Sequence, residues 1–326
     1  MHLYDTLPPH VQAILARFQA QYNSALESST PILTQGLDLV RQSKGKQLRP
    51  LLLILTASAL GCEDDRITNA AVFVELLHAS TLVHDDVLDE SDTRRGRPTP
   101  HAMLGDKKAV LLGDYMLCLA IKKALETQDL RVINTLSNLG QALTEGEFQQ
   151  MHASAQTLPT RQEYYQIIRS KTASLIATCF YLGGLLSGQA SETELKTLQN
   201  AGEMMGMAFQ MKDDVLDYTS SGQRLGKPVL NDLREHKITL PLLCALEKNS
   251  PGREHVVALL QQHPLEEFAI ATIHDYVLAH DGITEAEAVL QEYAAQGKQL
   301  LMAALPHNDS LQALLSVCNY MVTREH

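Results

Sequence analysis

Tryptophan is absent from this chain of 326 residues, and aromatic residues make up only 5% of it. Strands are enriched in aromatic and β-branched residues, whereas the abundant leucine and alanine are strong helix formers. Basic residues are also outnumbered: 27 Lys and Arg face 38 Asp and Glu, which leaves a net charge of −11. This charge disfavours a nucleic-acid partner, because such binding depends on a basic surface that neutralises phosphates. The composition favours a helical, acidic, globular protein.

Cysteines and long apolar runs are equally limited. The five cysteines are scattered without a CxxC pair, at positions 62, 118, 179, 244 and 318. They predict small buried hydrophobes in a reducing compartment rather than a disulfide framework or a zinc site. The first ten residues lack the pattern of a secretory signal, and the longest apolar stretches, 51–60 and 174–188, are too short to span a membrane. We therefore expect a cytoplasmic protein in which both stretches are buried helices.

Helical periodicity recurs along almost the whole chain, and alternating strand-like runs are nearly absent. Pro50 suits a first helical turn and Gly61 a C-terminal cap, whereas 92–100 and 220–228 have the composition of loops. Because no linker divides the chain, we predict an all-α bundle that forms a single domain over residues 1–326. The expected helices cover residues 8–26, 29–43, 50–61, 66–90, 106–127, 129–154, 161–187, 191–218, 231–247, 252–262, 264–280, 283–305 and 308–323.

Two aspartate clusters of the same form, DDVLD, are the most informative feature that is present. Each places its first and last carboxylates one helical turn apart on one face: Asp85 with Asp89, and Asp213 with Asp217. Like charges held this close repel unless a cation neutralises them, and Mg²⁺ accepts carboxylate oxygens while keeping positions for water and phosphate. One such cluster could be a solvated helix end, as the acidic run 63–65 is predicted to be. Two matching clusters predict a site for metal ions and a diphosphate.

Basic residues accompany both clusters. The paired Arg94 and Arg95 follow the first and could hold phosphate oxygens through bidentate hydrogen bonds. Gly226-Lys227-Pro228 and then Lys237 follow the second. Upstream, Lys46 and Arg49 lie just before a predicted helix, whose N-terminus also attracts anions. Lys171 interrupts an otherwise uncharged stretch, where it could either extend its head group to solvent or reach a buried phosphate.

Taken in order, these motifs resemble the trans-isoprenyl (polyprenyl) diphosphate synthase family, in particular its medium- and long-chain members. The resemblance runs from about Gly45 to Pro241, with a C-terminal match at Arg324. The matching pieces are Gly45-Lys46-x-x-Arg49-Pro50, Glu75-Leu76-Leu77-His78, the first aspartate cluster with Arg94-Arg95-Gly96, Gly113-Asp114, Gly146-Glu147-x-x-Gln150, Lys171-Thr172-Ala173, the second aspartate cluster, Gly226-Lys227, and Lys237-Ile238-Thr239-Leu240-Pro241.

The resemblance implies a single-domain helical bundle of the isoprenoid-synthase type around a central cavity. It implies a homodimeric prenyltransferase that condenses isopentenyl diphosphate head-to-tail onto an allylic diphosphate with Mg²⁺. Three metal ions would be held by Asp85, Asp89 and Asp213, with Asp86 and Asp217 supporting them through water. The allylic diphosphate would contact Arg94, Lys171, Lys227 and Lys237, with Lys171, Thr172 and Gln210 beside the reacting carbon. Isopentenyl diphosphate would contact Lys46, Arg49, His78, Arg95 and Arg324.

Three histidines need separate interpretations. His78 fits the family's isopentenyl site, but a buried structural histidine explains it as well. His84 directly precedes the first cluster, yet imidazole is a poor ligand for Mg²⁺, so we expect no direct metal role. His236 stands where the family usually carries glycine, which predicts an altered loop before Lys237.

Product length is the finer question. Short-chain members of the family carry large aromatics one turn before the first cluster, whereas this chain has Ser80 and Thr81 there. Small side chains would leave room for further C5 additions, so the resemblance implies a product of about C30 to C45, used as a quinone side-chain precursor. Leu77 could shape the chain-length floor, as could Val74, Leu117 and Phe148 by helical spacing. The alternatives are a short-chain C15 or C20 synthase, a non-catalytic subunit of a heteromeric synthase, or a catalytic chain that needs an accessory subunit. A terpene cyclase would lack the second cluster.

Overall fold

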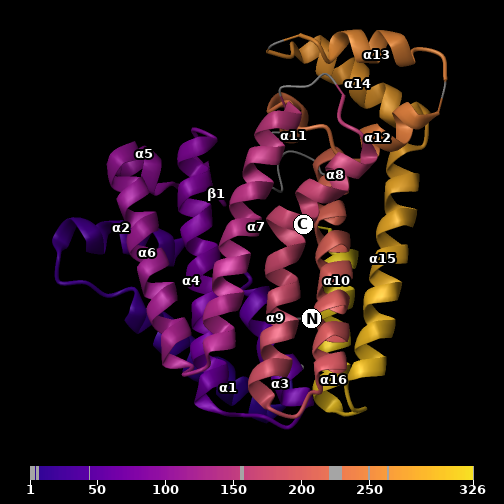
Figure 1. The fold of residues 1–326 in the computed structure, drawn as a ribbon. Helices are drawn as coiled ribbons and strands as arrows, with labels where there is room; N and C mark the ends of the chain where they lie inside the picture. The colour runs from indigo at the N-terminus through magenta and orange to yellow at the C-terminus, as the bar shows by residue number, and fades with distance from the viewer. Residues whose placement is uncertain are drawn as a thin grey trace. The chain divides into compact units, whose positions relative to one another are not determined.

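The computed structural model describes Tyr4 and residues 7–43, 45–154, 158–219, 230–248, 250–262 and 264–325. Helices dominate these residues, and the only strands within them are β1 (Thr93–Arg94) and β2 (Arg97–Pro98), which form one short antiparallel hairpin. The predicted all-α class is confirmed (Figure 1). None of the described helices is both long enough and apolar enough to cross a membrane.

The helices follow one another closely along the chain. Their bounds are α1 (Pro9–Ala25), α2 (Pro31–Gln42), α3 (Leu48–Ala59), α4 (Asp65–Leu88), α5 (Pro100–Leu104), α6 (Asp106–Glu126), α7 (Leu130–Ser154), α8 (Arg161–Ile168), the π-helix η2 (Arg169–Ala173), α9 (Ser174–Ser187), α10 (Glu192–Thr219), α11 (Asn231–Arg234), α12 (Leu240–Glu247), α13 (Arg253–Leu259), α14 (Glu267–Ala279), α15 (Gly282–Ala304) and α16 (Asp309–Thr323).

The chain forms two compact units. Unit 1 comprises residues 1–138, 178–199 and 301–317, and unit 2 comprises residues 139–177, 200–300 and 318–326. The boundaries fall inside helices rather than at linkers, and a single domain over 1–326 stays a prediction.

Unit 1 is built around α4, which packs against α1, α3 and α6. The expectation that 51–60 is a buried helix is confirmed, since every residue of α3 from Pro50 to Ala59 is buried. A helix that is apolar on all sides gains stability only in such a position. Gly183 on α9 makes this possible, because a Cβ there would lie 2.7 Å from the Leu53 carbonyl oxygen and 2.7 Å from the Thr56 Cβ.

Close contact between α4 and α6 depends on two small residues. A Cβ at Gly113 would overlap His84 Nε2, so glycine alone lets the imidazole fit. One turn earlier on α4, the buried Ser80 hydroxyl donates a hydrogen bond to the Gly113 carbonyl at 2.8 Å. The end of α4 that carries the first aspartate cluster is therefore held against α6.

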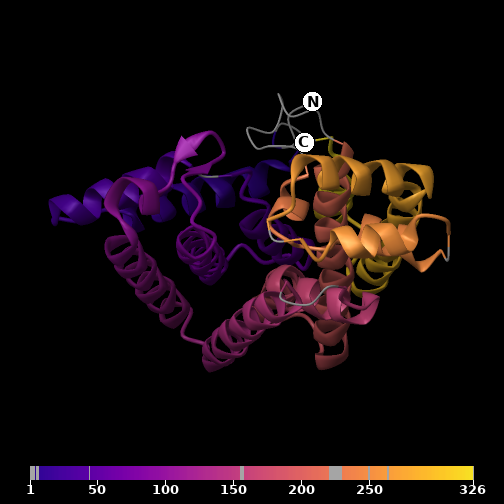
Figure 2. The same cartoon turned by 90° about the horizontal axis from the view of Figure 1, so that it is seen from above.

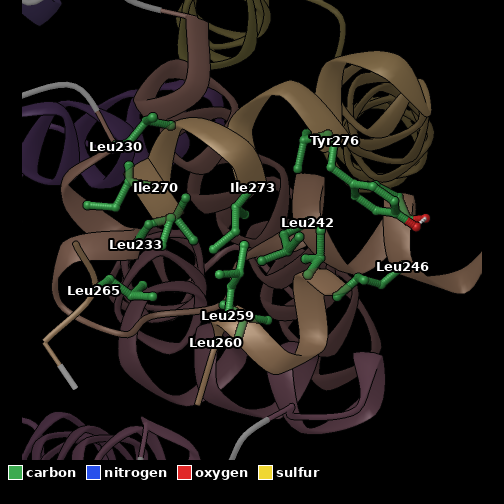
Figure 3. Packing of buried hydrophobic residues seen from close by; sticks show 14 of the residues in the cluster. Leu230, Leu233, Leu242, Leu246, Leu259, Leu260, Leu265, Ile270, Ile273 and Tyr276 are labelled. Atoms are coloured by element: carbon green, nitrogen blue, oxygen red, sulfur yellow. Dashed lines mark hydrogen bonds between the residues drawn. The ribbon is translucent and has the colours of Figure 1, made fainter. Parts of the chain in front are cut away.

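In unit 2, an apolar cluster joins α10 to the short helices α11, α12, α13 and α14. Figure 3 shows Leu233, Leu242, Leu259 and Ile273 among the side chains that point toward one another in this cluster. The orange helices α13 and α14 pack together (Figure 2). Burial of so many aliphatic side chains, at roughly 1.5–3 kcal/mol for each complete burial, anchors the segment that leads from α11 to α12.

The predicted helix over 231–247 is wrong in its middle, because residues 235–239 separate α11 from α12. Pro241 lies in the first turn of α12, where its missing N–H costs nothing, and Thr239 before it is extended. The predicted loop at 92–100 contains the hairpin, and α5 follows it. The predicted helix over 161–187 is continuous but includes the π-helical turn.

Candidate active site

The first aspartate cluster ends α4. Asp85 and Asp89 are one turn apart, and the Asp89 N–H donates to the Asp85 carbonyl at 2.8 Å, so both belong to the same face. Asp86 points elsewhere: it is 2% exposed, and its Oδ1 accepts hydrogen bonds from Arg94 Nε at 2.8 Å and from Arg94 Nη2 at 2.7 Å. The structure thus holds Arg94 beside the cluster through Asp86, a relationship that the sequence did not predict.

The Arg95-Gly96 pair forms the two-residue turn of the β1–β2 hairpin. Both residues have positive φ, +54° and +72°, as a type I′ turn requires. Arginine rarely adopts this conformation, and its side chain is fixed by a hydrogen bond from Nη1 to the Ser43 carbonyl at 2.6 Å. Gly45 makes room for it, because a Cβ there would lie 2.5 Å from Arg95 Nη2. Gly45 and Gly96, which belong to two separate motifs, thus both allow the observed conformation of Arg95.

Arg95 belongs to a charged group that also includes Arg49, Glu75 and His78. Burial raises the pKa of Glu75, and the positive charges of Arg49 and Arg95 oppose this rise. Desolvation lowers the pKa of His78 well below its usual value, and the same two arginines lower it further. His78 is therefore neutral at physiological pH. Lys46, whose carbonyl accepts a hydrogen bond from Tyr4, lies before the start of α3 and three residues before Arg49. Its contact with isopentenyl diphosphate stays a prediction.

His84 faces α6 rather than the carboxylates of its own cluster. Its Nε2 lies 3.2 Å from the Val110 carbonyl oxygen and 3.4 Å from Asp114 Oδ1. The motif Gly113-Asp114 is thereby explained: glycine gives the imidazole space, and aspartate pairs with it. His84 holds α4 in place.

The second aspartate cluster lies near the end of α10. Asp213 is partly exposed, and its Oδ1 accepts a hydrogen bond from Arg324 Nη2 at 2.7 Å. Arg324 also lies 4.1 Å from the centre of the Phe209 ring. Its predicted contact with isopentenyl diphosphate stays a prediction, and in this structure the guanidinium contacts Asp213, a predicted metal ligand.

Asp217 supports a helix. Its Oδ1 and Oδ2 accept hydrogen bonds at 3.1 Å from the backbone N–H groups of Asn231 and Asp232, at the start of α11. Burial raises the pKa of Asp232 well above its usual value, and the neighbouring charges of Asp214 and Asp217 raise it further. Asp217 therefore positions α11 in addition to its predicted support of the metal ions.

Lys171 and Thr172 lie on the π-helix η2, in which the Ser174 N–H bonds to the Arg169 carbonyl five residues back. Single π-helical turns occur often at functional sites. Lys171 Nζ lies 2.6 Å from Glu147 Oε2 and donates to Gln150 Oε1 at 3.1 Å, which accounts for the motif Gly146-Glu147-x-x-Gln150. Gly146 allows this approach, because a Cβ there would lie 3.1 Å from the Lys171 backbone nitrogen.

A pocket of about 200 Å³ in unit 2 brings the predicted catalytic residues together. Lys171, Thr172, Gln210 and Lys237 all line it. Lys237 Nζ donates to Glu235 Oε2 at 2.6 Å. His236, which also lines the pocket, has φ +54°, a left-handed conformation that explains why glycine suits this position. Lys227 and its neighbours Gly226 and Pro228 lie outside the described residues.

Each cluster supplies a carboxylate pair suited to Mg²⁺, which prefers oxygen ligands and uses one or two carboxylates with water and phosphate. Within the described part of the chain, no three His, Cys, Asp or Glu side chains converge on one point. A pair of carboxylates would leave the remaining coordination positions of such an ion to water and substrate oxygens.

The predicted chain-length residues lie on three helices, α4 and α6 of unit 1 and the unit 2 part of α7. Val74 and Leu77 are buried, Ser80 is bonded to α6, and the Thr81 hydroxyl donates to the His78 carbonyl at 2.8 Å. Phe148 is 70% exposed on α7. Its side chain lies in solvent, so the structure does not support it as a floor residue.

Sequence reasoning assigned no role to four residues of this site, Tyr164, Asp214, Glu147 and Gln150, although the last three lie within motifs that it identified. The signal for Glu147 and Gln150 was their spacing of three on a helix, which places both on one face. Nothing in the local sequence signalled Tyr164, because its partner Asp214 lies 50 residues away. Burial raises the pKa of Asp214 to about 7, and hydrogen bonds from Tyr164 and Gln210 oppose this rise.

The family model described as polyprenyl synthetase matches residues 30–283. The chain belongs to the polyprenyl synthetase family. It is accordingly a prenyltransferase, and the predicted family and enzyme class are confirmed.

Relatives and solved structures agree. The chain is 34% identical to octaprenyl diphosphate synthase of Haemophilus influenzae over 98% of this chain and 95% of the relative. It matches the crystal structure of heptaprenyl diphosphate synthase from Staphylococcus aureus with a TM-score of 0.91 and 31% identity, over 98% of this chain and 100% of the other. A polyprenyl synthase from Caulobacter crescentus CB15, complexed with calcium and isoprenyl diphosphate, matches with a TM-score of 0.89 and 29% identity over 99% and 98%.

Proposed function

We propose that this chain is a Mg²⁺-dependent all-trans polyprenyl diphosphate synthase. It adds isopentenyl diphosphate to an allylic diphosphate by head-to-tail 1′–4 condensation. The allylic C–O bond breaks, the isopentenyl double bond forms the new C–C bond, and a proton leaves to the departing diphosphate. The observation that carries the proposal is the unit 2 pocket, where Lys171, Thr172, Gln210 and Lys237 meet beside the second aspartate cluster. Family membership supports it.

The carboxylates of Asp85, Asp89 and Asp213 would hold three Mg²⁺ ions, with Asp86 and Asp217 supporting. When bound, such ions neutralise the charge that develops on a leaving diphosphate. The chain's own cations share this role. Arg94, Lys171, Lys227 and Lys237 would contact the allylic diphosphate, and Lys46, Arg49, His78 and Arg95 would bind isopentenyl diphosphate, helped by Arg324.

Lys171 illustrates how the fold prepares these contacts. Glu147 and Gln150 hold its ammonium at the pocket wall, so little side-chain entropy is lost when it meets an anion. Next to it, Thr172 and Gln210 present oxygen atoms rather than cations. The pocket thus offers a positive end for the diphosphate and a neutral polar wall for the allylic carbon.

For product length we propose a medium-to-long chain of about C30 to C45, supplied as a quinone side-chain precursor. Small residues at 80 and 81 support it, as does the similarity to an octaprenyl synthase. Ser80 and Thr81 differ in whether a bulky substitution can be used to test product length. A bulky residue at Ser80 would displace α6, whereas Thr81 is only partly buried and hydrogen-bonds within its own helix. Thr81 is therefore the position at which a large side chain can shorten the product.

A homodimer is supported by an exposed apolar stripe on α6, defined here as Leu111, Cys118, Ile121 and Leu125. Leu111, Cys118 and Leu125 recur at intervals of seven residues, and Leu111 and Leu125 are 66% and 57% exposed. A seven-residue apolar repeat is suited to packing against another helix. We assign this α6 stripe to a second copy of the chain.

The test is elongation by the purified protein with Mg²⁺, isopentenyl diphosphate and geranyl or farnesyl diphosphate, followed by sizing of the products. We expect products of about C30 to C45 from the wild type and shorter ones from Thr81→Phe. Exclusive C15 or C20 products would replace the proposal with a short-chain synthase. No elongation, alone or with an added partner subunit, would refute the activity itself.

A further inference from the structure

A chain of three hydrogen bonds connects the pocket wall to the interior of unit 2. Tyr164 Oη donates to Asp214 Oδ2 at 2.6 Å, Gln210 Nε2 donates to Asp214 Oδ1 at 2.9 Å, and Thr172 Oγ1 donates to Gln210 Oε1 at 2.7 Å. Its four residues come from α8, η2 and α10. Asp214 is 2% exposed and Tyr164 4%, so the inner end of this chain is shielded from water.

The chemistry of each group sets the direction of the bonds. When it is ionised, Asp214 has no proton to donate, so it accepts one hydrogen bond from the Tyr164 hydroxyl and one from the Gln210 amide nitrogen. The amide oxygen of Gln210 is then turned toward Thr172. Because that oxygen can only accept, the Thr172 hydroxyl must donate its hydrogen bond to Gln210. Thr172 and Gln210 lie on the pocket wall. With the hydroxyl proton directed at Gln210, these two side chains present oxygen lone pairs to the pocket.

Asp214 is separate from the face that would hold metal. Asp213 and Asp217 are one turn apart, whereas the neighbouring Asp214 points about 100° away, as consecutive residues on a helix do. The side chain of Asp213 is 42% exposed, in contrast with the buried Asp214. Both oxygens of Asp214 are already occupied. The second aspartate of this cluster therefore orients other side chains, much as Asp86 orients Arg94 in the first cluster.

We propose that Asp214 and Tyr164 are positioning residues that fix the polarity of Gln210 and Thr172, so that acceptor oxygens line the wall where positive charge develops on the allylic substrate. This inference rests on the proposed condensation. Dipoles that are already oriented stabilise a developing charge without reorganisation during the reaction, and this is often the largest contribution to catalysis. Reversing the polarity would instead direct a hydroxyl proton at the forming cation.

One substitution reverses the polarity with almost no change of shape. In Asp214→Asn, the new amide group can accept from Tyr164 and donate to Gln210, which would flip the glutamine and make Thr172 the acceptor. We expect kcat for elongation of farnesyl diphosphate to fall by roughly 10²-fold, the size seen when one preorganised donor of a charge-stabilising site is lost. KM for both diphosphates should stay within about threefold, since contacts to the substrate charges are unchanged.

A second substitution should restore the polarity. In Asp214→Asn combined with Gln210→Glu, the new asparagine donates to one oxygen of the new glutamate, and the other oxygen accepts from Thr172 again. We expect kcat to recover at least about tenfold over the single variant, because the group that faces Thr172 is once more an acceptor. Tyr164→Phe removes one donor and should lower kcat less than Asp214→Asn. Tyr165→Phe, on the adjacent residue of α8, is the matched control and should leave kcat unchanged.

Binding supplies a readout that does not depend on turnover. A stable ammonium analogue of the allylic cation and a neutral thio analogue of the same diphosphate are titrated calorimetrically at pH 8. Asp214→Asn should weaken the ammonium analogue about tenfold and leave the thio analogue unchanged, since only the former carries the charge that the wall stabilises. Thermal unfolding of each variant is followed in parallel.

The outcomes separate the two proposals. Wild-type protein that elongates no allylic primer would overturn the proposed function and this inference with it. Wild-type elongation combined with equal analogue discrimination in Asp214→Asn would overturn only the inference. So would a fall in kcat that the second substitution does not reverse, because that result would indicate packing rather than polarity.

Discussion

Arg324 and Asp213 are joined by a hydrogen bond of 2.7 Å between Nη2 and Oδ1, although 111 residues separate them in the sequence. The guanidinium is nearly buried and stacks 4.1 Å from the centre of the Phe209 ring. Within unit 2, the residue that follows α16 thus supplies a positive charge to a carboxylate that is predicted to bind metal. An arginine in this position would compete with a divalent cation for the same oxygen.

Arg324→Ala should therefore tighten the binding of Mg²⁺ or Mn²⁺ to the protein. The pair is partly exposed, so an effect of about 0.5–1 kcal/mol, or two- to fivefold in Kd, is expected. Titration of the substrate-free protein with Mn²⁺, followed by electron paramagnetic resonance, measures it. Arg169→Ala is the control, because Arg169 forms an ion pair with Glu203 at 2.8 Å outside the aspartate cluster. Unchanged or weaker Mn²⁺ binding in Arg324→Ala would contradict the competition.

The two neighbouring aspartates of the first cluster should differ in their effect on stability. Asp86→Ala leaves the Arg94 guanidinium without the carboxylate that accepts both of its short hydrogen bonds. Because Asp86 is buried, we expect the free energy of unfolding to fall by about 2–4 kcal/mol. Asp85→Ala, its matched control, relieves repulsion among carboxylates and should change stability by less than about 0.5 kcal/mol. Urea denaturation of both variants decides the matter, and equal losses would show that Asp86 has no special structural role.

Two glycine-to-alanine changes make a second matched pair. Gly113→Ala places a Cβ against His84 Nε2, so the imidazole must leave its position between α4 and α6. Overpacking of this kind should cost about 1–3 kcal/mol of stability. Gly140→Ala meets nothing within 4 Å on α7 and should stabilise the protein by up to about 1 kcal/mol, because alanine is the better helix former. Thermal unfolding measures both, and His84→Ala should reverse most of the loss in Gly113→Ala.

His236 provides a test of backbone strain. Its φ of +54° lies in the left-handed region, where a Cβ costs energy. His236→Gly and His236→Ala lose the same imidazole contacts, so their difference isolates the backbone. We expect the glycine variant to be more stable than the alanine variant by about 1 kcal/mol in chemical denaturation, after the higher entropy of unfolded glycine is included. The reverse order would show that the loop adjusts its conformation to the residue.

The α6 stripe predicts how the dimer can be broken. Leu111→Glu combined with Leu125→Glu places two charges in the proposed interface and should weaken self-association by at least about 2–4 kcal/mol. Sedimentation velocity would then show a monomer where the wild type is a dimer. Leu278→Glu changes an equally exposed leucine on α14 and should leave association intact. A wild-type monomer, or a double variant that still dimerises, would refute the assignment of the α6 stripe to a dimer interface.

Much of the fold could be predicted because the apolar residues of a helix recur in the sequence with the helical period. Most predicted helices agree with the observed bounds to within about two residues, as for α4, α6 and α7. The errors lie where this periodic pattern does not mark a change of structure. The π-helical turn at η2 interrupts no pattern, and the break between α11 and α12 depends on His236 and Pro241 together with the apolar cluster beneath them.

Composition and periodicity by themselves determined the helical class, the two DDVLD clusters indicated the chemistry of oxygen ligands and cations, and the ordered set of motifs carried the resemblance to the family. These properties follow from residue types and short spacings, which any reader of the chain can count. Only the tertiary structure decided the partners: Arg94 with Asp86, Lys171 with Glu147, and Arg324 with Asp213. It also showed that the second aspartate of each cluster is buried and accepts hydrogen bonds from other side chains. Hydrogen bonds between residues far apart in sequence depend on how helices pack, and that packing cannot be predicted from local sequence.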